Sequence, residues 1–151
     1  MHMQRCISVM SAILLLNIVV IACCGQTTVQ KVSDPLSTIN VSDANNLIAQ
    51  NIGNQKFVIL DIRPANDYTS RHIPGAIDIS YESAQSKNAV GKLDRNKQYL
   101  VYCQTGVNSA AAAQIMAGLG FKDVQDINGG YAAWVQAGFI TYGCPGTVIS
   151  K

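Results

Sequence analysis

Charged residues are scarce in this 151-residue chain: only 13% are Asp, Glu, Lys or Arg, and the formal net charge is +2. A balance so close to neutral excludes a protein that holds nucleic acid mainly by charge. The chain has two histidines and no Cys-x-x-Cys pair, so no metal site is indicated. It also lacks the glycine patterns that bind nucleotide phosphates. We therefore expect no cofactor.

The N-terminus carries an uncharged apolar run from Ile7 to Ala22, which follows Arg5. This order is typical of an export signal, and the run is shorter than the ~20 residues of a membrane-spanning helix. It ends in "VIAC", Val20 to Cys23, which resembles the lipobox of bacterial lipoproteins with Val in place of the commoner Leu. The resemblance implies that Cys23 is lipidated. The alternatives are an ordinary cleaved signal and an uncleaved anchor.

This interpretation divides the chain into a lipoprotein-type signal peptide at 1–22, a polar tether at 23–38 and one domain at 39–151. The domain would face an extracytoplasmic space, the periplasm, and its N-terminal lipid would hold it to a bacterial membrane. It contains two cysteines, Cys103 and Cys144. Two thiols in an oxidising compartment often form a disulfide, so a structural or regulatory crosslink is one interpretation of the pair.

Short apolar segments alternate with helical patterns along the domain. Strands are predicted at 56–63, 76–79, 99–103 and 123–127, and helices at 40–50, 66–70, 109–120 and 129–138, the first with Ser42 as its N-cap. This alternation predicts an α/β fold with a mainly parallel central sheet and helices on both faces. Reactive groups in such sheets gather beyond the carboxyl ends of strands, where Asp61, Arg63 and Cys103 are expected.

Cys103 stands between a predicted strand and an alanine-rich helix. The intervening loop is small and uncharged, and its residues are Gln104, Thr105, Gly106, Val107, Asn108 and Ser109. If the helix begins at Ser109, the peptide N–H groups of the loop can surround the sulfur, lower the pKa of the thiol and hold a thiolate nucleophile. The alternative is a cysteine that ends a strand as a small buried hydrophobe.

Three segments, in order, resemble the single-domain rhodanese family over about Ile39 to Trp134. They are Asp61, Arg63, Asp67, Tyr68 and the string 71–76 ("RHIPGA"); the loop 103–108; and Gly129, Gly130 and Trp134. The resemblance implies a rhodanese-like fold and sulfurtransferase activity. Cys103 would take a sulfur atom from a small anionic donor such as thiosulfate and pass it, as a persulfide, to cyanide or a thiol.

The resemblance also implies that the loop from Gln104 to Ser109 binds substrate and that Asp61 and Arg63 support it. Trp134 is predicted to belong to the core. We interpret His72 as a residue that stabilises a turn rather than as a base, because a thiolate formed by the loop needs no proton acceptor.

The loop departs from the family in one respect. Many members carry an arginine at its second or sixth position, where this chain has Gln104 and Asn108, so the donor stays open. Related phosphatases need Cys-x5-Arg, but the matching position is Ser109, which disfavours phosphatase activity. An arsenate-reductase-like activity with Cys144 as resolving thiol is a further alternative. The remaining alternative is a sulfur carrier, redox thiol or partner-binding module.

Overall fold

The computed structural model describes residues 35–80, 89–143 and 147–149 of the chain. Its central sheet has five parallel strands in the spatial order β1-β5-β4-β2-β3. The strands are β1 (Leu36–Ile39), β2 (Phe57–Asp61), β3 (Ala76–Asp78), β4 (Gln98–Tyr102) and β5 (Asp123–Ile127). The predicted α/β class with a parallel sheet is confirmed.

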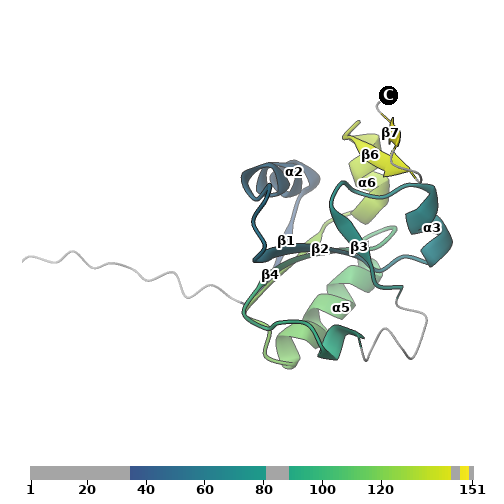
Figure 1. Cartoon of the computed structure of the whole chain (residues 1–151). Helices are drawn as coiled ribbons and strands as arrows, with labels where there is room; N and C mark the ends of the chain where they lie inside the picture. Colours follow the sequence, from purple (N-terminus) through teal and green to yellow (C-terminus); the bar gives the residue numbers. More distant parts are fainter. Residues whose placement is uncertain (1–34, 81–88, 144–146, 150–151) are drawn as a thin grey trace, which may run out of the picture. The chain divides into compact units, whose positions relative to one another are not determined.

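The helices cover both faces of the sheet. They are α2 (Val41–Gln50), α3 (Ala65–Ser70), α5 (Val107–Gly118) and α6 (Gly130–Gln136). Helix α5 lies on one face, whereas α2 and α6 lie on the other (Figure 1). Each face therefore has its own hydrophobic core.

The central strand β4 explains why the segment before Cys103 is apolar at every position. Side chains alternate across a strand, so Tyr99, Val101 and Cys103 pack in the core beneath α5. Leu100 and Tyr102 pack in the opposite core, under α2 and α6. A strand buried on both faces needs an unbroken apolar run, which is what the sequence shows here.

The register of the sheet brings the predicted site residues to one edge. Asp61 at the end of β2 is the direct partner of Tyr102 at the end of β4. Because the two strands are parallel, Cys103 and Arg63 leave the sheet at the same edge. The predicted gathering of Asp61, Arg63 and Cys103 at the carboxyl ends of strands is therefore observed.

Several predicted boundaries are wrong. Strand β1 begins at Leu36, inside the range 23–38 expected as a tether, because its backbone pairs with β5 at the edge of the sheet. Helix α2 is capped by Asn40 rather than Ser42, since Asn40 Oδ1 accepts the Asp43 N–H at 2.9 Å. Helix α5 begins at Val107 rather than Ser109.

An antiparallel pair near the C-terminus was not predicted. It consists of β6 (Thr141–Gly143) and β7 (Thr147–Ile149). Tyr142 exchanges two backbone hydrogen bonds with His72, of 2.8 and 2.9 Å, which tie β6 to the segment after α3.

Several expectations lie outside the described residues. These are the signal peptide at 1–22, the lipidated Cys23, the tether up to residue 34, and Cys144 with its possible disulfide. Among the residues that are described, none of the helices has the length and apolar character needed to cross a membrane.

Candidate active site

Cys103 lies directly after β4, at the head of a short loop that leads into α5. Its side chain is only 4% exposed. The sulfur accepts hydrogen bonds from the peptide N–H of Gly106, at 3.1 Å, and of Ser109, at 3.4 Å. The loop thus folds back around the sulfur, as predicted for an amide-lined cradle.

This cradle decides the protonation of the thiol. Burial alone raises the pKa of Cys103, because a charged sulfur is poorly solvated inside the protein. Hydrogen bonds from the Ser109 side chain and from the N–H groups of Ser109, Thr105 and Gly106 lower it by more. The net pKa of Cys103 therefore lies below its ordinary value of 9.0, which raises the thiolate fraction at neutral pH.

The loop turns sharply at Gly106. This residue is the N-cap of α5 and has a φ of +90°, a backbone conformation that residues other than glycine rarely adopt. A Cβ here would also stand 3.0 Å from the Gly129 nitrogen and 3.1 Å from the Ile127 oxygen. The turn is thus what points the N–H of Gly106 at the sulfur.

The other loop side chains face outward. Gln104, Thr105, Val107 and Asn108 are all exposed, Val107 by 73%, whereas Ser109 is fully buried. The four exposed side chains are uncharged and form the rim around Cys103. The structure therefore brings together all six predicted loop residues, although only Ser109 has its side chain beneath the rim.

The Gly129-Gly130 pair holds this loop in place, a role that the sequence analysis did not assign. The N–H of Tyr131 donates to the Cys103 carbonyl oxygen at 2.8 Å, and the N–H of Ala132 donates to that of Gln104 at 3.0 Å. A Cβ on Gly130 would overlap the Cys103 carbonyl oxygen and lie 2.7 Å from the Gly106 nitrogen. Only glycine lets α6 approach the loop closely enough to make these bonds. The two consecutive glycines at the start of a predicted helix were the sequence signal for this close approach.

Asp61 and Arg63 form a buried ion pair beneath the site, with side chains 0% and 3% exposed. Arg63 Nη2 lies 2.7 Å from Asp61 Oδ2 and also donates to the Arg71 carbonyl oxygen at 2.6 Å. The Tyr102 hydroxyl donates to Asp61 Oδ2 at 2.6 Å. Since Tyr102 directly precedes Cys103, the ion pair fixes the end of the strand from which the cysteine emerges.

The Arg63 guanidinium also packs on the ring of Tyr131, with 3.8 Å between its Cζ and the ring centroid. Burial lowers the pKa of Arg63, but the bonds and charge of Asp61 more than reverse this, so its net pKa is raised and it stays charged. The Arg63 guanidinium therefore stabilises the buried part of the site through both its ion pair with Asp61 and its contact with the Tyr131 ring. It links Asp61 to the residue whose N–H holds the Cys103 carbonyl.

The contacts of His72 and Trp134 agree with the predictions of a turn-stabilising histidine and a core tryptophan. His72 Nδ1 lies 2.9 Å from the Tyr68 carbonyl oxygen, and its ring stacks on that of Tyr68 with centroids 4.1 Å apart. These are contacts of a residue that stabilises a turn.

Trp134 is 2% exposed, and its Nε1–H donates to the Ile140 carbonyl oxygen at 3.0 Å. Its predicted place in the core is confirmed.

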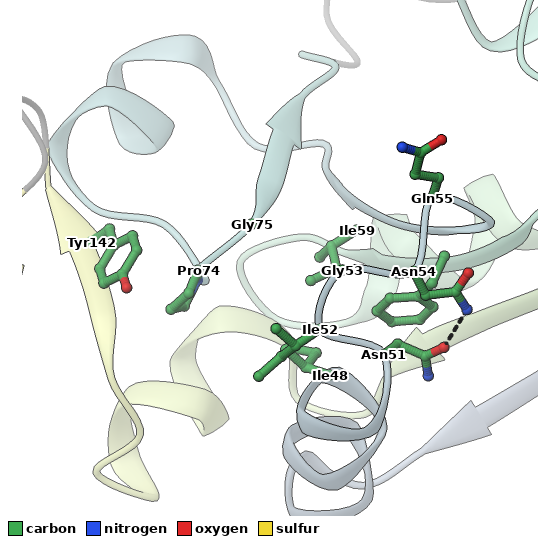
Figure 2. A pocket seen from close by; sticks show the side chains of 11 residues that line it. Ile48, Asn51, Ile52, Gly53, Asn54, Gln55, Ile59, Pro74, Gly75 and Tyr142 are labelled. Carbon is green, nitrogen blue, oxygen red and sulfur yellow. Dashed lines mark hydrogen bonds between the residues drawn. The ribbon is translucent and has the colours of Figure 1, made fainter.

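A groove elsewhere on the domain lies between the segment after α2 and Tyr142 of β6 (Figure 2). Ile52, Pro74 and Tyr142 line it together with polar side chains such as Asn51 and Asn54, which are joined by a 2.7 Å hydrogen bond. None of the residues that line it belongs to the loop 103–109. The groove is therefore separate from the candidate active site, and nothing in the sequence analysis predicted it.

Fold and site together define a single-domain α/β protein that presents a cysteine of lowered pKa in an amide-lined loop. The chain belongs to the rhodanese family, because the sequence model of the family described as rhodanese-like domain matches residues 44–137.

Two relatives carry the name thiosulfate sulfurtransferase GlpE. The one from Shewanella oneidensis is 35% identical over 79 residues, which cover 52% of this chain and 76% of the relative. The one from Pseudomonas savastanoi pv. phaseolicola is 34% identical over 86 residues, covering 57% and 79%. A crystal structure of the Alr3790 protein from Anabaena sp. is 26% identical, with a TM-score of 0.59 and coverage of 71% and 83%. The family and the two named relatives support sulfurtransferase as the enzyme class of this chain, and the solved structure supports its fold.

Proposed function

We propose that this protein transfers a sulfane sulfur from a donor such as thiosulfate to cyanide or a thiol through a persulfide on Cys103. The observation that carries the proposal is the cradle in which the Gly106 and Ser109 N–H groups point at the Cys103 sulfur. The names of the relatives support thiosulfate as a donor.

In the first half-reaction, the Cys103 thiolate attacks the outer sulfur of thiosulfate. A new bond forms between the two sulfurs, the S–S bond of thiosulfate breaks, and sulfite leaves with the electron pair. In the second half-reaction, the acceptor attacks the outer sulfur of the persulfide, and the electron pair of the broken bond returns to Cys103. The lowered pKa of Cys103 suits both steps, because this sulfur is first the nucleophile and then the leaving group.

The uncharged rim shapes how a donor would be held. Gln104 and Asn108 are exposed and neutral, at the two positions where many family members carry arginine. Peptide N–H groups at the turn would then provide the attraction for an anionic donor, together with the N-terminus of the twelve-residue helix α5.

Steady-state kinetics test the proposal. With thiosulfate and cyanide varied together, we expect thiocyanate to form by a ping-pong mechanism, with parallel lines in double-reciprocal plots, because sulfite leaves before cyanide reacts. A Cys144→Ser variant should behave like the native protein, since the mechanism uses Cys103 alone. Absence of thiocyanate with Cys103 reduced would contradict the proposal and favour the carrier or partner-binding alternative. Intersecting lines would contradict the persulfide route, because both substrates would then bind before any product leaves.

We also propose that residues 1–22 direct export and that Cys23 anchors the domain to a bacterial membrane from the periplasmic side. The support is the lipobox-like segment of the sequence. In bacteria that express the full chain, labelled palmitate should enter the native protein and not a Cys23→Ser variant. Unlabelled native protein in the cytoplasmic fraction would contradict this proposal.

A further inference from the structure

Ser109 has a hydroxyl group in the interior of the candidate active site. The residue lies in the first turn of α5, and its side chain is 0% exposed. Its N–H donates to the Cys103 sulfur at 3.4 Å. When its hydroxyl donates to that sulfur as well, it lowers the pKa of the thiol. Of the six loop residues, this is the one whose side chain is wholly shielded from water.

The hydroxyl has two acceptors and one proton. In the structure, Ser109 Oγ donates to the Gly106 carbonyl oxygen at 3.0 Å. That oxygen also accepts the Ala110 N–H at 3.1 Å, as the first turn of the helix requires. If the hydroxyl turns to the sulfur, the Gly106 carbonyl therefore keeps a partner, and no buried acceptor is left unpaired.

The charge on the sulfur decides which acceptor is preferred. A thiolate is a much better acceptor than a thiol or a sulfur bound in a persulfide, because hydrogen bonds to charged groups are roughly twice as strong. The peptide N–H groups of Gly106 and Ser109 are fixed by the backbone. The hydroxyl, in contrast, can rotate and respond to the charge.

We propose that Ser109 is a catalytic residue whose hydroxyl donates to the Cys103 sulfur when this sulfur is a thiolate and returns to the Gly106 carbonyl when it is a persulfide. The inference rests on the proposed function for its place in the cycle. When the acceptor takes the outer sulfur and the S–S bond breaks, the electron pair moves onto Cys103. The hydroxyl then stabilises this leaving group and keeps its own proton.

The rate at which Cys103 is alkylated reports how strongly the Ser109 hydroxyl stabilises the thiolate, and its measurement needs no sulfur donor. Trypsin releases residues 98–122 as one peptide in which Cys103 is the sole cysteine, so its reaction with iodoacetamide can be followed separately. In Ser109→Ala the thiolate loses a donor, and we expect about tenfold less thiolate at neutral pH. The thiolate that does form is more basic, and its intrinsic reactivity rises about threefold.

These two effects predict crossing pH profiles. Alkylation of Ser109→Ala should be about threefold slower than that of the native protein near neutral pH and about threefold faster on the high-pH plateau. Release of sulfur from the preformed persulfide to cyanide should slow by about three- to tenfold. A Ser109→Thr variant, which keeps the hydroxyl, should restore the native profile.

Thr69→Ala is a matched control. Like Ser109, Thr69 has a hydroxyl that donates to backbone carbonyl oxygens of its own helical turn, in this case those of Ala65 and Asn66 in α3, at 3.0 Å each. It should leave the alkylation of Cys103 unchanged. A Ser109→Ala profile that superimposes on the native one, or that shifts only as Thr69→Ala does, would overturn the inference. If the profiles cross but thiosulfate yields no persulfide, the inference stands and the proposed function fails.

Discussion

Replacing Gly130 with alanine is expected to lower the free energy of unfolding by about 2–4 kcal/mol and to remove most of the sulfurtransferase activity. The new Cβ would lie 2.7 Å from the Gly106 nitrogen and 3.0 Å from the Gln104 carbonyl carbon, and it would overlap the Cys103 carbonyl oxygen. All three neighbours are backbone atoms, which cannot move aside as a flexible side chain would. The loop must therefore shift away from α6, and its N–H groups lose their aim at the sulfur.

The backbone conformation of Gly130 adds to this cost, because φ is +57°. Gly138, at the other end of α6, separates the two effects. It has φ of +76°, but a Cβ there would meet no atom within 4 Å. Urea unfolding should show that Gly138→Ala costs about 1 kcal/mol and leaves the activity intact. Equal stability and activity in the two variants would show that close packing of α6 does not position the loop.

Replacing Asp61 with asparagine is expected to lower the free energy of unfolding by about 3–5 kcal/mol. The Asp61 carboxylate accepts the Arg63 backbone N–H at 2.9 Å, its Nε–H at 3.0 Å and the Tyr102 hydroxyl at 2.6 Å. An uncharged side chain would leave the Arg63 guanidinium buried without its counter-charge. The ring of Tyr131 would then lose a fixed partner, so the activity should fall together with the stability.

Asp78→Asn is the matched control for this prediction. Asp78 is the register partner of Asp61 on the neighbouring strand β3, but its side chain is exposed and accepts the Ser80 hydroxyl. Removal of an exposed charge should change the unfolding free energy by no more than about 0.5 kcal/mol. The account of the buried pair is contradicted if urea unfolding shows similar losses for the two variants.

The sequence predicted those parts of the fold and site that depend on local pattern. The short apolar segments at 56–63 and 99–103 indicated two strands of the sheet, and the loop after the second indicated a cradle for Cys103. Strand β1 was missed because four residues in which Ser37 and Thr38 are exposed form no recognisable apolar pattern. Asn40 and Ser42 are both good N-caps, and only the observed bond to Asp43 distinguishes them.

The contacts that support the site join residues far apart in the sequence. Arg63 packs on Tyr131, and the N–H of Tyr131 holds the carbonyl of Cys103. No periodicity or spacing records that three separate strand ends and a helix start converge on one point, since the register of the sheet and the packing of α6 decide it. The family motifs marked Asp61, Arg63 and Gly130, but the physical task of each became visible only in three dimensions.

The most direct test of the central claim is the mass of the Cys103 peptide after incubation of the protein with thiosulfate. The protein is alkylated without reduction and digested with trypsin, and peptide 98–122 is weighed beside that of a Cys103→Ser variant. We predict one additional sulfur, about 32 Da, on the native peptide alone, and its removal by cyanide. A native peptide that carries only alkylated thiol, with the extra sulfur absent or on Cys144, would contradict the claim.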